Sequence, residues 1–427
     1  MQIDLKYGPR GLTVELPHTA GFAGILAPKP VAALADPAQA VAQALEAPMD
    51  APPLSQLARG RGSACIVISD ITRPVPNRLL LEPILAALEA AGLAREKITI
   101  LIATGTHRPN EGAEAERLVG PAIARGYRLI SHRCTHKDEM SSVGTLAGGV
   151  DVLINKTYLA AELKILTGFI EPHMWAGYSG GRKSILPGIS SLDTVKYLHG
   201  PRIIAHPNVE YGVLEGNPFH EAALAAMAQA GADFIVNVTL DGRQQITRIF
   251  AGHPVAAHLA GCNFLADQCI RTLDAPLDFI LTTNAGAPLD CNLYQTTKGM
   301  IAAAPAVKPG GVILIASACF EGAGSADFQR VMDMMDTPQE LLARLMAEEF
   351  FIPDQWCAQE ICQVLLRNPV WLHTAGIEPA RLKRYHFQPV PSIENAVTDL
   401  LARFGPDARW AVAPEGPMVI LRAGQMS

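Results

Sequence analysis

The chain has 427 residues, of which 49% are hydrophobic and 18% are charged. This length and composition predict two globular domains with buried cores and exclude a disordered chain. The net charge of −6 argues against nucleic acid as a partner, because binding to a phosphate backbone needs a basic surface.

The opening residues alternate apolar and polar side chains like a first strand, and no apolar stretch of a signal peptide follows them. Apolar runs elsewhere have the length of strands, whereas a membrane-spanning helix needs about 20 residues. The eight cysteines form no Cys-x-x-Cys pair, which argues against a zinc knuckle. We therefore expect a cytoplasmic protein with reduced cysteines and no membrane partner.

Apolar residues recur with the spacing of alternating strands and helices along most of the chain. A β-rich opening (1–30) and an Ala/Pro-rich segment (28–54) lead into this pattern. Strands are expected at 63–70, 97–103, 127–130, 150–154 and 233–239, and helices at 77–92, 191–198, 217–230 and 254–268. After a break at 271–277, strands are expected at 278–283 and 311–317, and helices at 293–304, 337–347 and 354–367.

This alternation on both sides of the break predicts an α/β protein with two α/β domains, 1–273 and 274–427, each built on a mostly parallel sheet. In such sheets ligands bind at the carboxyl ends of the strands. Polar residues follow two of the expected strands, in Asp70-Ile-Thr-Arg73-Pro-Val-Pro and in Thr104-Gly-Thr-His107-Arg-Pro. Arg73 offers a planar donor pair for a carboxylate or a phosphate. A capped turn in which Arg73 pairs with Asp70 is the alternative.

Residues 171–184 read Glu-Pro-His-Met-Trp-Ala-Gly-Tyr-Ser-Gly-Gly-Arg-Lys-Ser and carry the most chemistry. His173 is a candidate acid or base at neutral pH. Gly180 and Gly181 allow backbone N–H groups to approach an anion. Lys183 is a cation at ordinary pH and a nucleophile where it is desolvated.

A phosphate-binding P-loop is disfavoured here, because Arg182 stands directly before Lys183, where that motif needs glycine. A glycine-rich turn with a solvated Arg-Lys pair remains the alternative. His199 follows an expected helix, where histidines commonly satisfy the helix dipole at the surface. Four further histidines are expected on the surface: His132, His136, His253 and His258.

In the second half, Gln295 and Lys298 lie three residues apart, so they share one face at the start of an expected helix. A helix N-terminus that carries a lysine and an amide suits a carboxylate, although a solvated face has the same pattern. Trp356 is compatible with simple core packing.

Together these segments resemble the lactate racemase family, in which a nickel-pincer nucleotide serves the racemisation or epimerisation of 2-hydroxy acids. The similarity runs through the three segments quoted above and Leu198-His-Gly, and continues in Pro288-Leu-Asp, Tyr294-Gln-x-x-Lys-Gly-Met and Asp354-Gln-Trp. It therefore spans both predicted domains in order. The resemblance implies an active-site cleft between the domains, with the cofactor and catalytic groups on 1–273.

The resemblance also implies a role for each candidate residue. Lys183 would carry the cofactor through a thioamide, His199 would be the protein ligand of nickel, and His107 and His173 would be the acid/base pair. The substrate carboxylate would be held by Arg73, Gln295 and Lys298 with Trp356 beside it, and the cofactor would lie near Asp70, Gly180 and Gly181. Cofactor-biosynthesis enzymes are the implied protein partners.

The implied reaction moves hydride from the substrate carbon to a pyridinium carbon of the cofactor while a histidine takes the hydroxyl proton, which avoids a carbanion. Return of hydride to the other face inverts the centre, so each enantiomer needs its own base. The chain departs from the family at Ala287, where tyrosine is usual, and at Cys291, where an amide is common. These departures leave the side chain of the 2-hydroxy acid open.

Two readings of other classes remain open on the residues alone. One is a nucleotide- or phosphate-binding module that uses Gly180, Gly181 and Lys183 without chemistry. The other is a zinc-dependent hydrolase with His107, His173 and His199 as its metal ligands.

Overall fold

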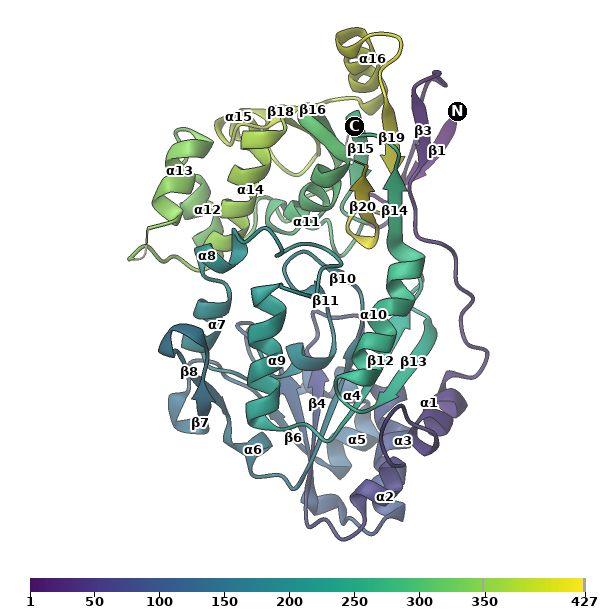
Figure 1. Cartoon of the computed structure of the whole chain (residues 1–427), viewed down its shortest axis with the longest axis vertical. Helices are drawn as coiled ribbons and strands as arrows, with labels where there is room; N and C mark the ends of the chain where they lie inside the picture. The colour runs from purple at the N-terminus through teal and green to yellow at the C-terminus, as the bar shows by residue number, and fades with distance from the viewer. Residues whose placement is uncertain (348, 425–427) are drawn as a thin grey trace. The chain divides into compact units, whose positions relative to one another are not determined.

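The computed structural model describes residues 1–347 and 349–424, which fall into two compact units (Figure 1). The central unit comprises residues 30–267, and the terminal unit combines residues 1–29 with residues 268–427. The predicted division at 273/274 is linear, and the structure differs from it in the first 29 residues, which join the C-terminal part of the chain. The reason is strand pairing, because β3 (Phe22–Ile25) lies beside β19 (Trp410–Ala413) at the edge of a sheet.

The central unit is built on a six-stranded sheet of order β13-β12-β9-β4-β5-β6. Its strands are β4 (Ala64–Ser69), β5 (Ile98–Ala103), β6 (Arg128–Ser131), β9 (Leu163–Phe169), β12 (Phe234–Leu240) and β13 (Ile246–Gly252). Every neighbouring pair is parallel except β12–β13. Strands β4 and β9 are buried on both faces, as their unbroken apolar runs require, so the predicted α/β class is confirmed.

The central unit also contains α-helices. They are α1 (Pro37–Glu46), α2 (Leu54–Ala58), α3 (Asn77–Ala90), α4 (Ala113–Val119), α5 (Pro121–Gly126), α6 (Lys156–Leu159), α7 (Leu192–Leu198), α8 (Pro201–Ile204), α9 (Pro218–Ala230) and α10 (Ala256–Cys269). One hydrophobic core joins α3 to the sheet through Leu80 and Ile84, which pack with Ile66 and Ile100. The expected strand at 150–154 forms outside the main sheet, as β8 (Asp151–Asn155) in an antiparallel hairpin with β7 (Met140–Thr145).

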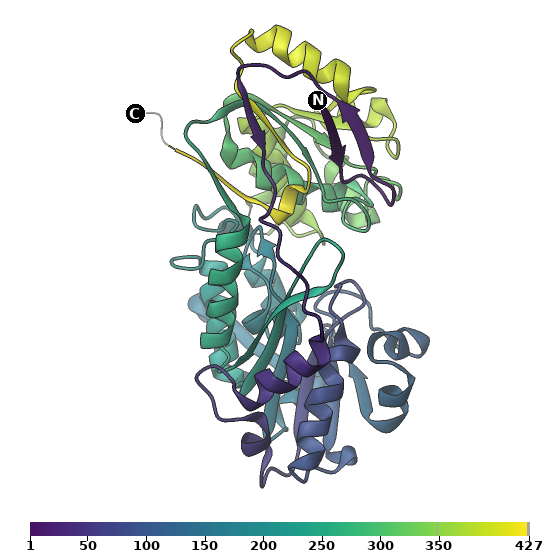
Figure 2. The same cartoon turned by 90° about the vertical axis from the view of Figure 1, so that its right-hand side faces the viewer.

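The terminal unit has an all-parallel sheet of order β18-β17-β16-β15-β19-β3. Its further strands are β15 (Leu277–Thr283), β16 (Val307–Ala316), β17 (Val370–His373) and β18 (Gln388–Pro389), with the pairs β1 (Gln2–Leu5)–β2 (Leu12–Glu15) and β14 (Ile270–Leu273)–β20 (Ile420–Ala423) beside it. Its helices are α11 (Leu293–Ala303), α12 (Ala326–Met332), α13 (Pro338–Leu345), α14 (Gln355–Arg367), α15 (Pro379–Arg384) and α16 (Ile393–Phe404). Figure 2 shows the purple N-terminal strands among the yellow C-terminal elements.

No helix within residues 1–347 and 349–424 combines the length and the hydropathy that a membrane crossing needs. All eight cysteines are present as free thiols.

Candidate functional site

The loops that follow β4 and β5 meet at the carboxyl edge of the central sheet, as expected for parallel neighbours. His107 Nδ1 lies 2.8 Å from Asp70 Oδ2, and Thr72 Oγ1 donates to Asp70 Oδ1 at 2.7 Å. Asp70 is 3% exposed, whereas the side chain of His107 is 49% exposed. The buried carboxylate therefore orients a histidine that solvent can reach.

The charge state of Asp70 follows from its partners. Burial alone would raise the pKa of this carboxyl, but the hydrogen bond and charge of His107, helped by Thr72 and Arg73, hold the pKa below its ordinary value. An ionised Asp70 accepts the Nδ1–H of His107, which leaves Nε2 as the atom that exchanges protons. This arrangement suits a general acid or base.

Hydrogen bonds to neighbouring segments fix the loop that carries His107. Gly105 adopts a φ of +55°, which makes a tight bend before His107, and its N–H donates to Gly188 O at 3.0 Å. Thr104 Oγ1 donates to the carbonyl of His132 at 2.8 Å. The turn that presents His107 is thus fixed to two other segments of the central unit.

Arg73 points to a carboxylate other than the one expected in the capped-turn alternative. Its guanidinium lies 3.9 Å from Glu171 Oε1, and both side chains are half-buried. Asp70 instead caps its own turn through Thr72. Glu171 was not singled out from the sequence, although it opens the segment that we found most informative.

Within residues 171–184, the glycines adopt backbone conformations that other residues rarely adopt. Gly177, Gly180 and Gly181 have φ values of +71°, +81° and +53°. A Cβ on Gly180 would come within 2.7 Å of Asn237 Oδ1, and the N–H of Gly181 already donates to that oxygen at 2.8 Å. The Gly181 amide is therefore committed to the protein interior.

Arg182 is the buried member of the Arg-Lys pair, so the alternative of a solvated pair is wrong for it. It is 1% exposed and donates to Ala176 O at 2.7 Å, to Gly180 O at 3.2 Å and to His258 Nε2 at 2.7 Å. His258 is buried too, and the expectation of a surface histidine is wrong there as well. Arg182 thus holds the turn from inside by satisfying carbonyls that would otherwise be buried without donors.

Lys183 lies against His173. Its Nζ is 2.6 Å from His173 Nε2. The other ring nitrogen, His173 Nδ1, accepts the backbone N–H groups of Trp175 and Ala176, both at 3.2 Å. The backbone of the same segment therefore fixes the orientation of the His173 ring toward the lysine.

His199 is the C-cap residue that follows the short helix α7, and its two ring nitrogens have different environments. Nδ1 lies 3.0 Å from Val195 O, so it carries the proton, and Nε2 keeps a lone pair. Burial is the main cause that lowers the pKa of His199, to about 4, against the opposing effect of the Val195 carbonyl. A neutral imidazole with its second nitrogen fixed by a carbonyl is the form that binds a metal.

Aromatic rings connect these groups into one cluster. The Phe219 ring centroid lies 5.2 Å from that of His199 and 6.3 Å from that of His173, and Lys183 Nζ is 5.7 Å from the Phe219 ring. Trp175 lies 5.2 Å from the His199 ring. Phe219 is the second residue of helix α9, which Asn217 caps by accepting the N–H of Phe219, and nothing in the sequence pattern marked it as part of the site.

The donors fit a metal held by one protein ligand and an organic group. Among residues 1–347 and 349–424, no group of three or more His, Cys, Asp or Glu side chains is arranged to hold a metal ion. His107, His173 and His199 therefore do not form the ligand set that a zinc hydrolase needs. The single Nε2 lone pair of His199, close to the amine of Lys183, suits a metal whose other donors come from a group tethered at that lysine.

The candidate carboxylate-binding residues other than Arg73 belong to the terminal unit. Gln295 and Lys298 are half-buried in the first turns of α11, where Asn292 caps the helix by accepting the Gln295 N–H. The Oε1 atom of Gln295 is buried and has no hydrogen-bond partner within the described chain. Trp356 is 7% exposed and donates from Nε1 to Tyr294 Oη at 2.8 Å, which brings Tyr294 into this group.

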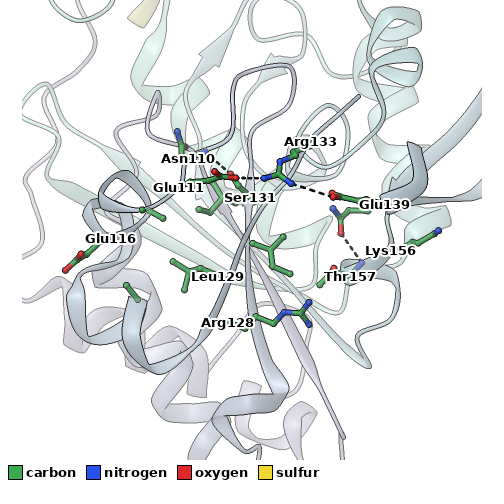
Figure 3. A pocket seen from close by; sticks show the side chains of 16 residues that line it. Asn110, Glu111, Glu116, Arg128, Leu129, Ser131, Arg133, Glu139, Lys156 and Thr157 are labelled. Carbon is green, nitrogen blue, oxygen red and sulfur yellow. Dashed lines mark hydrogen bonds and ion pairs between the residues drawn. The ribbon is translucent and has the colours of Figure 1, made fainter. Parts of the chain in front are cut away.

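A pocket of about 680 Å³ lies elsewhere in the central unit, beside the edge strand β6 (Figure 3). None of the residues singled out from the sequence lines it. Its Arg133 forms ion pairs with Glu111 and Glu139, as the dashed lines in Figure 3 show, so its charge is already compensated. We assign this pocket no part in the chemistry.

His132 is fully buried, so its expected surface position is wrong. Its Nε2 lies 2.9 Å from Ser190 O, and its Nδ1 lies 3.3 Å from Asn155 Nδ2. A neutral ring satisfies both neighbours by donating to one and accepting from the other. Burial lowers the pKa of His132 to about 4.

This histidine predicts acid sensitivity of the fold. An unfolded histidine takes a proton below about pH 6.5, and folded His132 does so only near pH 4, so its contribution to stability is complete above pH 6.5 and is lost toward pH 4. We expect His132→Gln to remove up to about 3 kcal/mol of the decline in unfolding free energy over that range. Urea denaturation of both proteins at several pH values measures this, and parallel pH curves would contradict it.

Comparison with known proteins shows which family the chain resembles along its length. A model described as the lactate racemase N-terminal domain matches residues 7–212, and one described as the lactate racemase C-terminal domain matches residues 273–421. The chain is 36% identical over 425 residues to the lactate racemase of Thermoanaerobacterium thermosaccharolyticum, covering 98% of the chain and 99% of that protein. It is 34% identical over 426 residues to the lactate racemase of Lactiplantibacillus plantarum, with the same coverage.

Two solved structures have a fold similar to that of this chain. The structure of the lactate racemase apoprotein from Thermoanaerobacterium thermosaccharolyticum superposes with a TM-score of 0.93 at 35% identity, covering 99% of this chain and all of that one. A protein from Thermotoga maritima gives a TM-score of 0.67 at 17% identity over 91% of this chain and 99% of that one, a likeness of fold alone.

Proposed function

Because the chain belongs to the lactate racemase family, we propose that it is an isomerase that racemises lactate or a closely related 2-hydroxy acid. The family expected from the sequence motifs is confirmed by both family models and by full-length relatives. The observation that carries the proposal is that Lys183, His173 and His199, named from those motifs, gather in one cluster around Phe219.

We propose a nickel-pincer nucleotide as the cofactor, which would supply, when bound, a carbon that accepts and returns hydride and a nickel ion beside it. Lys183 would hold it covalently through Nζ. His199 Nε2 would be the protein ligand of nickel, since Nδ1 is occupied by Val195 O. Enzymes that make this cofactor are the proposed partners.

The remaining residues would bind and deprotonate the substrate. His107, oriented by Asp70, would exchange the hydroxyl proton of one enantiomer, and His173 that of the other. Arg73, Gln295 and Lys298, with Trp356, would hold the carboxylate. A carboxylate held in one place lets the two enantiomers present their hydroxyl groups to different bases. Because the chain differs from the family at Ala287 and Cys291, the proposed substrates include 2-hydroxy acids other than lactate.

Deuterium at carbon 2 of the substrate tests this proposal. A hydrogen that leaves as hydride and returns without meeting water is retained, whereas a proton taken by a base exchanges with solvent. We expect (2-²H)-lactate to racemise in ordinary water with its deuterium kept, as measured by mass spectrometry of each enantiomer after chiral separation. The protein should be produced together with the cofactor-making enzymes. Washout of the label as fast as racemisation would contradict hydride transfer.

The phosphate-binding alternative has less support. It relies on Gly180 and Gly181 as an anion nest, but the Gly181 N–H donates to Asn237 and a Cβ on either glycine would meet interior atoms. Arg182 faces the interior as well. Binding of phosphate to the protein without any racemase activity of the cofactor-loaded form would favour it.

A further inference from the structure

The contact between His173 and Lys183 constrains where the protons lie. Two backbone N–H groups point at His173 Nδ1, so this nitrogen is an acceptor and carries no hydrogen. A neutral imidazole then has its hydrogen on Nε2. That atom lies 2.6 Å from Lys183 Nζ, so the amine must accept the hydrogen bond.

An ammonium group cannot accept a hydrogen bond, because all of its electron pairs are used. If Lys183 were protonated, Nε2 would have to be bare, and the ring proton on Nδ1 would face two N–H donors. The packing that fixes the ring therefore favours an unprotonated lysine.

We infer that His173 holds Lys183 as an unprotonated amine in the cofactor-free protein and so prepares it as a nucleophile. This inference rests on the proposed function for its purpose, which is attachment of the cofactor. It gives His173 a positioning role that precedes any role in racemisation. A lysine of ordinary pKa is about one part in a thousand unprotonated near pH 7.4, so such preparation changes the rate of attachment greatly.

The attachment step balances without an oxidant or a reductant. Thioamide formation joins Nζ to a thiocarboxyl carbon and breaks the carbon–oxygen bond. The oxygen leaves as water, with one hydrogen from the amine and one from the thiocarboxylic acid. The lone pair of a thioamide nitrogen is delocalised, so Nζ no longer accepts from His173 Nε2. Attachment therefore also releases His173 from the lysine.

Trace acetylation of the cofactor-free protein tests the inference. Acetic anhydride at pH 7.4 acylates only unprotonated amines, with acetate as the leaving group, and it is small enough to reach a half-buried lysine. We expect Lys183 to be acetylated at least tenfold faster than the exposed lysines Lys6 and Lys97, as measured by mass spectrometry of peptides. A rate for Lys183 no higher than theirs would overturn the inference.

A variant and a matched control separate preparation from packing. His173→Asn puts an amide oxygen near the position of Nδ1, which keeps an acceptor for the backbone N–H groups, but it has no donor that reaches Lys183. We expect acetylation of Lys183 to slow at least tenfold. His253 accepts the N–H groups of Val255 and Ala256 at 3.3 and 3.4 Å in the same kind of turn, so His253→Asn should leave the rate unchanged.

An unchanged rate in His173→Asn would overturn the inference, because a purely structural histidine predicts that result. The outcome is independent of the racemase assay. Fast acetylation of Lys183 in a protein that never racemises a 2-hydroxy acid would reject the proposed function and keep the prepared lysine. Racemisation by a protein whose Lys183 is acetylated slowly would keep the proposed function and reject the prepared lysine.

Discussion

Lys183→Ala is expected to abolish covalent attachment of the cofactor and to reduce racemisation at least about a thousandfold. The proposed tether is a bond to Nζ, and alanine has no nucleophile at that position. Intact mass is the direct measurement. Wild-type protein made together with the cofactor-making enzymes should be heavier than the chain alone by the mass of the attached group, and the variant should have the mass of the chain alone.

Lys97→Ala serves as the matched control, since Lys97 is an exposed lysine far along the chain from the site. It should keep both the added mass and the activity. Equal masses of wild type and Lys183→Ala, with wild type active, would show that no tether exists at this lysine. If the wild-type protein had simply failed to receive the cofactor, the masses would also be equal, but the wild type would then be inactive.

The second large effect is expected at the acid/base pair. His107→Asn should lower turnover by about 10²–10⁴-fold while the cofactor stays attached, because Asn cannot exchange the hydroxyl proton. If each histidine serves one enantiomer, this variant should still convert the other enantiomer to the 2-keto acid once. Single-turnover formation of keto acid from each pure enantiomer measures this asymmetry.

His136→Asn is the control for that experiment, because His136 is a half-exposed histidine that lies 3.5 Å from Glu139 in its own segment. We expect its turnover to equal that of wild type. Equal loss of both half-reactions in His107→Asn would reject the assignment of one base to each enantiomer. Full activity would remove His107 from the chemistry altogether.

Local pattern predicted much of the fold. The strands expected at 63–70 and 97–103 form as β4 and β5 within one residue, because an apolar run of that length between polar turns has few alternatives. The place of the first 29 residues was not predictable. It depends on the pairing of β3 with β19, and the short strand β3 carries no signal of a partner almost 400 residues away.

The site shows the same division between local and remote information. The meeting of Asp70 and His107 followed from the rule that parallel strands end at one edge of a sheet. The burial of Arg182 could not be predicted in this way. Its partners are mostly backbone carbonyls, and because every residue has one, the sequence does not indicate which carbonyls an arginine will bind. Phe219 was missed for a related reason, since a phenylalanine near a helix start usually belongs to the core.

The pairing of β3 with β19 sets an order of events during protein synthesis. Phe22 has Trp410 as its partner, so the first strand leaves the ribosome hundreds of residues before its neighbour exists. At about 5–20 residues per second, this wait lasts roughly 20–80 s. The central unit, continuous from residue 30 to 267, is complete well before the wait ends. The half of the protein that carries Lys183 and His173 can therefore fold first, while the start of the chain is still waiting for its end.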